Sequence, residues 1–469
     1  MNNNVRYLLD NASFFCYNIM IENLYRRGVA VGAFTVGIYT LGCKVSQYES
    51  EAIKEAFSLA GWEVLPFSEA CDAYVINTCT VTAESDRKCR QIIRRAIAKS
   101  PNAKIAVIGC YGQLGSDEIA KIGGVDIILG TDGKMSVVGL ISNIMDKPKS
   151  DKPYISVTDL SEADFEPMCV KQAPRTRAYV KIEDGCESRC TYCAIKDARG
   201  RVRSKPREEV ISEVLGLYRS GTREIVLTGI ETGAYGKDFK DGYGLADLIL
   251  ELDALCACER LRLGSLAPEL VGEEFARRVM GAKVLAPHFH LSLQSGSDAI
   301  LARMKRKYNS DMAYRVIDSL RKYIKGAQLT TDLMVGFPGE TEEDFQRTVE
   351  LVRRVGFIDA HIFAYSRRPG TPAADYDGQI PESVKRQRSR ILIEEARLSR
   401  DRVLSELVAG GKELRCIAET VHGDEIEGHS DEFACVRVPA GAIMPGESFT
   451  VIPVSHKDGV IYGKSVEKI

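Results

Sequence analysis

The feature that most constrains the fold of this 469-residue chain is a repeated alternation of short apolar runs with amphipathic segments. In a first series, strands are predicted at residues 36–41, 73–77, 104–108 and 125–129. Residues 46–60 and 83–99, which lie between these runs, read as helices. Alternation of this kind is typical of α/β folds, in which helices flank a parallel sheet. We therefore expect an N-terminal doubly wound parallel-sheet domain over residues 36–145.

A second series follows a polar, proline-containing segment, residues 146–177, which we interpret as a linker. Its strands are predicted at residues 179–182, 224–228, 260–265, 289–293, 329–335 and 360–364. Six β–α units are fewer than the roughly eight that close a barrel, so we expect a central partial (β/α)6 barrel over residues 178–405. Thr341, with Asp344 three residues later, predicts the capped start of one of its helices.

The two ends of the chain have a different character. A basic helix is predicted at about residues 382–407. The C-terminal domain, residues 406–469, overlaps the end of this helix and contains short β-rich runs separated by Gly, Pro and Asp. Strands are predicted there at residues 413–418, 433–438, 448–452 and 460–462, which indicates a small C-terminal all-β barrel or sandwich. Residues 1–35 show no clear period, and we interpret them as an N-terminal extension, with Met20 as one alternative start.

Composition limits the classes of function. Lys and Arg total 63 against 65 Asp and Glu, so any binding of nucleic acid must use local patches rather than bulk charge. No stretch approaches the roughly 18 apolar residues of a membrane helix, and we expect no membrane partner. We find no secretory signal. The chain has 14 cysteines and is long enough to form its core without disulfides. We therefore expect a reducing compartment, the cytoplasm, and cysteines that serve metal binding or catalysis.

Three cysteines lie in one short loop. Cys186, Cys190 and Cys193 form a C-x3-C-x2-C pattern just after the first predicted strand of the barrel, at the end where such folds place their chemistry. Three thiolates in one loop can hold three irons of a [4Fe–4S] cluster and leave the fourth iron open. A structural zinc loop is the alternative, but zinc prefers four closed ligands and none of the six histidines lies nearby.

Three further cysteines share a placement in the first domain. Cys43, Cys79 and Cys110 each follow a different predicted strand. Because the carboxyl ends of parallel strands face one crevice, the three thiols should converge as a second ligand set. Taken singly, each could be a small buried apolar residue. Cys71 and Cys89 lack this placement, and we interpret them as structural.

The cysteine loop resembles the radical S-adenosylmethionine signature, and residues 36–469 resemble the methylthiotransferase family of radical S-adenosylmethionine enzymes. The resemblance is carried by residues 40–45 (TLGCKV), 77–82 (NTCTVT), 109–110 (GC), 199–201 (RGR), 227–229 (LTG), 293–297 (LQSGS) and 335–341 (VGFPGET). It implies an N-terminal three-cysteine domain, a radical core and a C-terminal TRAM-like barrel. It also implies two [4Fe–4S] clusters, held by the two cysteine sets, and S-adenosylmethionine as cofactors.

Within the family, Leu41-Gly42-Cys43-Lys44-Val45 is closest to the branch that methylthiolates N6-threonylcarbamoyladenosine beside the tRNA anticodon. The isopentenyladenosine branch usually has Gly-Cys-Gln-Met here, and the branch that acts on a ribosomal-protein aspartate has Gly-Cys-Ala-Lys-Asn. The resemblance therefore implies a transferase that acts on the tRNA anticodon loop, in which a 5′-deoxyadenosyl radical takes hydrogen from carbon 2 of the modified adenine. The second cluster would deliver a methylated sulfur. A flavodoxin or ferredoxin is implied as electron donor.

Other readings stay open at this point. Within the enzyme class, the alternatives are methylthiolation of isopentenyladenosine in tRNA or of a ribosomal-protein aspartate. Outside it, the alternative is an iron–sulfur or zinc module that binds RNA without catalysis. No acid or base for proton transfer is evident in the sequence, and the catalytic residues are unassigned.

The resemblance places S-adenosylmethionine contacts at the ends of later strands. The candidate residues are Thr228, Gly229, Glu231, Gln294, Gly336, Glu340 and Tyr365. Ordinary strand ends and turns are the alternative for most of them, and Tyr365 could belong to the core. At Ala267 the chain lacks a carboxylate that the family pattern leads us to expect.

A basic run follows the cysteine loop. Arg199, Arg201 and Arg203 suit contacts with RNA phosphates, although such runs are usually a solvated face. Weaker candidates of the same kind are Lys305, Arg306, Lys307, Lys385, Arg386, Arg388 and Arg390.

Overall fold

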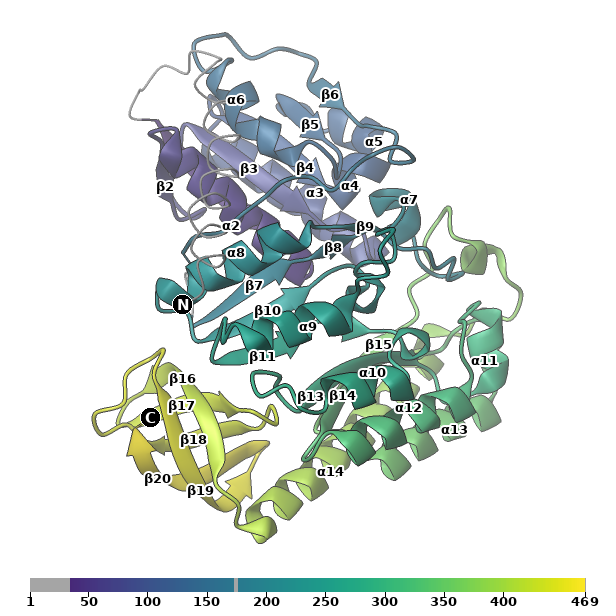
Figure 1. Cartoon of the computed structure of the whole chain (residues 1–469). Coiled ribbons are helices and arrows are strands. Elements are labelled where there is room, and N and C mark those ends of the chain that lie inside the picture. The colour runs from purple at the N-terminus through teal and green to yellow at the C-terminus, as the bar shows by residue number, and fades with distance from the viewer. Residues whose placement is uncertain (1–33, 173–175, 469) are drawn as a thin grey trace. The chain divides into compact units, whose positions relative to one another are not determined.

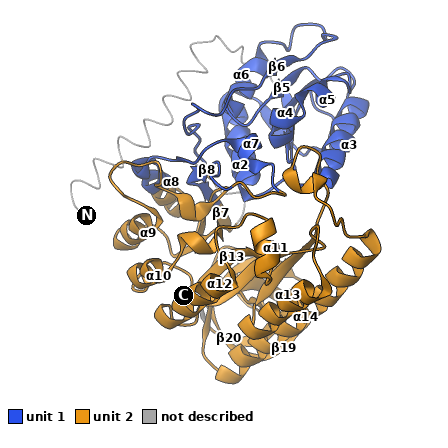
Figure 2. Ribbon diagram, turned by 90° about the vertical axis from the view of Figure 1, so that its right-hand side faces the viewer, with its two compact units in different colours: residues 1–171, 179–188, 193–213 blue, residues 172–178, 189–192, 214–469 orange. Residues whose placement is uncertain are grey.

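The computed structural model describes residues 34–172 and 176–468. The chain forms two compact units, which Figure 2 shows in different colours: residues 1–171, 179–188 and 193–213 make up unit 1, and residues 172–178, 189–192 and 214–469 make up unit 2. Of the extension expected at residues 1–35, all but the last two residues lie outside the described part, and Thr35 already begins the first strand. None of the helices in the described part is both long enough and apolar enough to cross a bilayer.

Unit 1 contains a six-stranded parallel sheet in the order β2-β1-β3-β4-β5-β6 (Figure 1). Its strands are β1 (Thr35–Thr40), β2 (Glu63–Leu65), β3 (Ala73–Thr78), β4 (Lys104–Gly109), β5 (Ile127–Leu129) and β6 (Tyr154–Ser156). Its helices are α2 (Lys44–Leu59), α3 (Ala83–Lys99), α4 (Cys110–Leu114), α5 (Ser116–Ala120) and α6 (Val137–Ser142). The chain runs outward from β1 in one direction and from β3 in the other, which confirms the doubly wound topology.

Two strands of this sheet were not predicted. β2 and β6 are three residues long and form the two edges of the sheet. β6 lies within residues 146–177, the segment expected to be a linker, and pairs in parallel with β5. A three-residue edge strand shows too little alternation to be seen in the sequence, because only its backbone pairing defines it.

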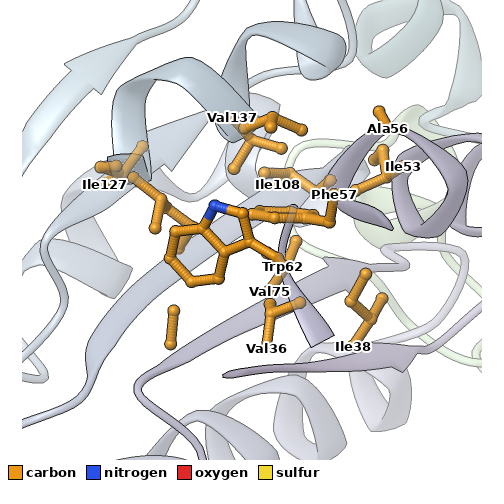
Figure 3. Packing of buried hydrophobic residues seen from close by; sticks show 14 of the residues in the cluster. Val36, Ile38, Ile53, Ala56, Phe57, Trp62, Val75, Ile108, Ile127 and Val137 are labelled. Carbon is orange, nitrogen blue, oxygen red and sulfur yellow. The ribbon is translucent and has the colours of Figure 1, made fainter. Parts of the chain in front are cut away.

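Apolar side chains fill both sides of this sheet. On one side, Trp62 packs among residues of β1, α2 and α6, as Figure 3 shows. On the other side, Tyr74 and Ile76, two positions apart on β3, pack with Ile93 of α3. Because successive residues of a strand point to opposite faces, a strand covered on both sides is apolar nearly throughout. This explains the continuous apolar runs in the sequence.

Later parts of the chain return to unit 1. The short strands β8 (Glu183–Asp184) and β9 (Arg203–Ser204) pair in antiparallel fashion, and helix α7 (Ile195–Arg199) lies between them in the sequence. The Thr131 hydroxyl donates to the Ala198 carbonyl over 2.6 Å, which holds the end of α7 against the sheet domain. Strand β7 (Arg177–Lys181) and helix α8 (Arg207–Arg219) each cross from one unit to the other.

Unit 2 contains the second series of parallel strands. β10 (Glu224–Thr228) pairs with β11 (Arg260–Leu263), and β12 (Ser265–Leu266), β13 (His288–Gln294), β14 (Gln328–Val335) and β15 (Asp359–Ala364) pair in that order. The helices are α9 (Leu245–Ala254), α10 (Glu273–Val279), α11 (Asp298–Arg303), α12 (Ser310–Tyr323), α13 (Glu342–Val355) and α14 (Glu382–Gly410). The strand predicted at residues 260–265 is divided at Gly264, where a Cβ atom would lie 2.6 Å from the Thr232 hydroxyl.

The predicted capping box at the start of α13 is confirmed. The Thr341 hydroxyl accepts from the Asp344 amide over 3.1 Å, and the Asp344 carboxylate accepts from the Thr341 amide over 3.0 Å. Two amides that a helix start would otherwise leave without partners are thereby satisfied.

The C-terminal domain is a closed barrel in the order β16-β17-β18-β20-β19. Its strands are β16 (Leu414–His422), β17 (Glu425–Ser430), β18 (Cys435–Pro439), β19 (Ser448–Lys457) and β20 (Val460–Lys468). The prediction of a small all-β barrel is confirmed, but β17 was missed because its sequence, EIEGHS, contains a single large apolar residue.

Within unit 2, the loop between β17 and β18 binds the strands of the α/β part. Arg260 pairs with Asp431 over 2.6 Å, and Arg262 donates to the Asp431 carbonyl over 2.9 Å. The Phe433 ring stacks on the His288 ring with 4.2 Å between centroids. These contacts fix the small barrel to β11 and β13.

Candidate metal centres

Three cysteines of unit 1 lie at the carboxyl ends of three neighbouring strands. Cys43 follows β1 as the residue that caps α2, Cys79 directly follows β3, and Cys110 begins α4 directly after β4. β1, β3 and β4 are adjacent in the sheet, and the chain order reverses between β1 and β3. Open α/β sheets bind ligands at such a reversal. The predicted convergence of these strand ends is confirmed.

The loops that carry these cysteines approach each other closely. Gly42 has φ +137°, and a Cβ atom there would lie 3.3 Å from Cys79 Cβ. Gly109 has φ +95°, and a Cβ atom there would meet the Asn77 side-chain oxygen at 2.6 Å. Glycine is therefore required directly before both Cys43 and Cys110, for its left-handed backbone and for space.

The three thiols are free, and two of them are buried. Burial, with a smaller contribution from the nearby Cys110, raises the pKa of Cys79 to about 11. Burial also raises the pKa of Cys110, although the Arg199 charge opposes this. The thiolate is the form that binds metal, so binding of a cation would displace the protons.

Arg199 connects this cysteine set to a buried ion network. Its Nε lies 3.2 Å from Cys110 Sγ, and its Nη1 donates to Glu49 over 2.6 Å and to Asp184 over 3.1 Å. Lys181 bridges the same two carboxylates. Burial pushes the pKa of Glu49 upward, but the charges of Arg199 and the two neighbouring lysines outweigh it and hold that pKa well below its usual value.

This placement corrects the expectation that Arg199 and Arg203 contact RNA. Arg199 is fully buried, and Arg203 is 3% exposed and lies 3.8 Å from Asp184. A phosphate cannot reach guanidinium groups that are enclosed by carboxylates inside the domain. Arg201 differs, since 41% of its side chain is exposed, and it donates to the backbone carbonyls of Ser161 and Ala163.

The loop with Cys186, Cys190 and Cys193 begins beside the same network of buried ion pairs. The Cys186 amide donates to the Gly200 carbonyl over 3.0 Å, so Cys186 lies next to the residue that follows Arg199. Gly185 has φ +88°, and a Cβ atom there would lie 1.7 Å from the Arg201 carbonyl oxygen. Residues 186 and 193 belong to unit 1, and Cys190 belongs to unit 2.

Each cysteine sulfur of this loop accepts a hydrogen bond from an N–H group. The Ser188 amide lies 3.4 Å from Cys186 Sγ, and the Ile195 amide lies 3.4 Å from Cys193 Sγ. Within unit 2, Arg306 Nη1 lies 3.2 Å from Cys190 Sγ. N–H donors aimed at sulfur stabilise thiolates and tune iron–sulfur clusters. Arg306, which its sequence context makes a weaker candidate for RNA contacts, thus contacts a cysteine sulfur within its own unit.

Three predicted cofactor contacts lie around the end of β10. Thr228 ends this strand and is buried, and Gly229 follows it. Glu231 accepts from the Ala267 amide over 3.0 Å. Burial raises the pKa of Glu231 to about 7, so this carboxyl changes its charge near neutral pH. The backbone of Ala267 thus binds the carboxylate of Glu231, at the position where a carboxylate of its own was expected.

The other predicted contacts lie at the ends of β13, β14 and β15. Gln294 ends β13 with φ +62°, a left-handed conformation rare outside glycine. The Gly336 amide donates to Glu340 over 2.7 Å, and Glu340 pairs with Arg388 over 2.6 Å. The Glu340 carboxylate thus accepts from an amide of its own loop, residues 336–340, and stabilises that loop. Tyr365 is 2% exposed and packs in a buried cluster with Phe337, which favours its reading as core.

In each unit, the structure shows interacting polar residues that the sequence did not single out. Glu49 lies on the apolar face of α2, and a buried glutamate among apolar helix positions was the available signal. In unit 2, His290 and His361 both bind Asp332, over 3.2 and 3.1 Å, with ligand atoms within 4.8 Å of one another. They come from β13, β15 and β14. Hydrogen bonds to the carboxylate account for their arrangement.

The donor set fits iron–sulfur clusters. Both sets consist of three cysteines, and sulfur is the usual ligand of such clusters. A guanidinium group contacts a sulfur of each set, Arg199 at Cys110 and Arg306 at Cys190. Cationic donors of this kind suit the negative charge of a thiolate-held cluster, whereas structural zinc requires a fourth protein ligand.

Comparison with known families agrees with this geometry. Residues 180–352 match the model described as Radical SAM superfamily, and residues 35–130 match the one described as Uncharacterized protein family UPF0004. The first match covers β10 to β14 and most of α13. The second covers β1 to β5 with Cys43, Cys79 and Cys110.

Several curated proteins are similar over most of the chain. Threonylcarbamoyladenosine tRNA methylthiotransferase MtaB of Thermotoga maritima is 42% identical over 82% of this chain and 86% of its own. The protein of the same name from Bacillus subtilis is 42% identical over 76% and 79%. The tRNA-2-methylthio-N(6)-dimethylallyladenosine synthase of Clostridium tetani is 34% identical over 80% and 85%.

Among solved structures, the radical S-adenosylmethionine methyltransferase TsrM from Kitasatospora setae is similar, with a TM-score of 0.52 and 16% identity over 73% of this chain and 74% of that one. This likeness concerns the fold alone. The identity to these two MtaB relatives extends over at least three quarters of the chain. The chain therefore belongs to the methylthiotransferase family of radical S-adenosylmethionine enzymes.

Proposed function

We propose that this protein adds a methylthio group to carbon 2 of N6-threonylcarbamoyladenosine next to the tRNA anticodon. The observation that carries this proposal is the 42% identity to relatives of that name, over more than three quarters of the chain. The two cysteine sets support it, because one chain then provides separate sites for radical formation and for the sulfur that is transferred. Relatives named for dimethylallyladenosine are 32–35% identical, whereas those named for threonylcarbamoyladenosine range from 34% to 42%.

Cys186, Cys190 and Cys193 would hold one [4Fe–4S] cluster, and Cys43, Cys79 and Cys110 the other. With S-adenosylmethionine bound, these groups supply the radical chemistry at carbon 2 and the methylated sulfur. The protein contributes binding and orientation. Its own residues anchor both loops beside the Arg199–Gly200 pair, through the Cys110 sulfur on one side and the Cys186 amide on the other.

At the end of β10, Thr228, Gly229 and Glu231 would bind the methionine part of S-adenosylmethionine. An ionised Glu231 suits the ligand's ammonium group, and Gly229 allows close approach of the backbone. Gln294 and Gly336 end neighbouring strands and would complete this site. Glu340 and Tyr365 are not part of the proposed S-adenosylmethionine site, because Glu340 pairs with Arg388 and Tyr365 packs in a buried apolar cluster.

The tRNA partner would present a base that is splayed out of the anticodon loop. Arg386 and Arg390, one turn apart on the exposed side of α14, line an open surface depression together with Ser383, Gln387 and Ile391. Lys385 and Arg388 of the same helix are buried and bind Tyr365 and Glu340 instead. Arg386, Arg390 and Arg201 remain candidates for phosphate contacts. A flavodoxin or ferredoxin would supply electrons.

The deciding experiment is nucleoside mass spectrometry of tRNA from a strain that lacks the gene. We expect 2-methylthio-N6-threonylcarbamoyladenosine to disappear, N6-threonylcarbamoyladenosine to accumulate, and the wild-type gene to restore the first. Complementation with a Cys43→Ala, Cys79→Ala, Cys110→Ala variant should fail. Persistence of the methylthio nucleoside in a strain without a second such enzyme contradicts the proposal, and loss of the dimethylallyl product instead would assign the other substrate.

A further inference from the structure

The contact between Arg199 and Cys110 is unusual because both groups are buried. Arg199 is fully buried and Cys110 is 4% exposed, and 3.2 Å separate Nε from Sγ. The other guanidinium nitrogens are held by Glu49, with Nη1 at 2.6 Å and Nη2 at 3.3 Å. This double contact fixes the plane of the guanidinium group, so that Nε–H points toward the sulfur.

Arg199 belongs to a buried network of charged groups. The ion pairs of this network join Lys134, Lys181, Arg199 and Arg203 to Glu49 and Asp184. A further carboxyl, Glu166, lies near Lys134, and burial raises its pKa to about 7. Arg199 thus brings a buried, oriented positive charge to the Cys110 sulfur.

We propose that Arg199 is a positioning residue for the second iron–sulfur cluster, which donates Nε–H to the Cys110 sulfur and raises the reduction potential of that cluster. A [4Fe–4S] cluster on three thiolates is negatively charged and becomes more so on reduction. A buried cation and an N–H···S bond stabilise the reduced form more than the oxidised one. The carboxylates of Glu49 and Asp184 fix the orientation of Arg199.

The position of Arg199 in the chain adds a structural consequence. Arg199 ends α7, which begins two residues after Cys193, and Gly200 accepts from the Cys186 amide. The segment from Cys186 to Arg199 therefore contains the ligands of one cluster and ends on the residue that contacts a ligand of the other. Movement of α7 would alter both sites. The inference uses the second cluster of the proposed function but not its tRNA substrate.

The test uses the full-length chain with Cys186, Cys190 and Cys193 replaced by Ala, so that the second cluster alone is reconstituted. In this background we expect Arg199→Lys, which keeps the charge but loses the planar fork, to retain its iron and to shift the midpoint potential to more negative values. The measurement is a redox titration followed by electron paramagnetic resonance. The double variant Arg199→Gln, Glu49→Gln, which removes one charge of each sign, should shift the potential further.

The matched control is Arg90→Gln. Arg90 donates to the hydroxyl of Tyr111, the residue after Cys110, over 2.8 Å, so the control removes an arginine that contacts the neighbour of the cluster ligand without removing the sulfur contact. Its potential should equal that of the parent. An Arg199→Lys protein with bound iron and an unshifted potential overturns the proposal.

A second measurement needs no change at Arg199. In the same background labelled with 15N-arginine, pulsed electron paramagnetic resonance of the reduced cluster should detect one arginine nitrogen coupled to it. Absence of this coupling also overturns the proposal, whether or not the variants fold. If both measurements succeed while the tRNA nucleoside test fails, the inference stands and the substrate assignment does not.

Discussion

Arg306 donates to the sulfur of Cys190 over 3.2 Å, so a guanidinium group contacts a cysteine of the Cys186–Cys193 loop just as Arg199 contacts Cys110. Arg306 also donates to the Ser292 carbonyl over 3.2 Å and lies over the Tyr308 ring, which fixes its orientation. Its sequence neighbours Lys305 and Lys307 are exposed. The three basic residues therefore have different roles although they are adjacent in sequence.

We predict that Arg306→Gln lowers the rate of S-adenosylmethionine cleavage about 10- to 100-fold, the usual cost of losing a group that supports a metal ligand. The assay is release of 5′-deoxyadenosine under a strong reductant, with iron content measured in parallel. Lys307→Gln is the matched control and should retain the parent rate. Equal rates for the two variants would contradict a role of Arg306 at Cys190.

The two cysteine sets should load independently. After anaerobic reconstitution we expect about eight irons in the parent and about four when either set is replaced by Ala. Cys71→Ala and Cys89→Ala, which remove buried cysteines outside both sets, should leave the iron content unchanged. Iron and acid-labile sulfide analysis measures this, and about one zinc with little iron would support the alternative of a structural zinc site.

Glu231 makes S-adenosylmethionine binding depend on pH. Burial holds its pKa at about 7 in the free protein, and only the carboxylate can pair with the ligand's ammonium group. As the pH falls through 7, protonation removes this partner, so the dissociation constant should rise about tenfold between pH 7.5 and pH 6.

Equilibrium binding to the cluster-loaded enzyme at several pH values checks this prediction. Glu231→Gln should bind more weakly at pH 7.5 and show little change with pH in this range. A parent protein whose affinity is constant from pH 6 to pH 7.5 would argue against contact between Glu231 and the ammonium group.

An element can be predicted from the sequence when it depends on residues that are close together along the chain. The period of apolar residues predicts β1, β3, β4 and the core strands of unit 2, because burial on both faces leaves a continuous apolar run. Strands β2, β6 and β17 leave no such trace, since they are short or polar and are defined by pairing with distant segments. The capping box of α13 was predictable because it depends on residues only three positions apart.

The same distinction holds at the candidate site. The convergence of Cys43, Cys79 and Cys110 follows from strand order and could be predicted. The burial of Arg199 could not, because Glu49 lies 150 positions away and nothing in the local basic run records that pairing. A run of arginines is usually exposed, and only the fold shows which of them finds carboxylates inside.

Phe433 illustrates a local exception that is also testable. The strand predicted to begin at this residue starts at Cys435 instead, because Phe433 has φ +74°, a left-handed conformation that strands do not use. The ring nevertheless stacks on His288 and lies under Arg262, and so holds the small barrel in place within unit 2. Packing of the aromatic ring therefore outweighs a backbone cost of about 1–2 kcal/mol.

We predict that Phe433→Ala lowers the opening free energy of the small barrel by about 2 kcal/mol, since the ring is only partly buried. Phe433→Gly removes the same ring but accepts the left-handed backbone, so it should be about 1 kcal/mol more stable than Phe433→Ala. Hydrogen–deuterium exchange of residues 414–468 measures both values. This order is the reverse of that at ordinary positions, where Ala is favoured over Gly. A glycine variant less stable than the alanine variant would show that the backbone at Phe433 is not strained in the folded protein.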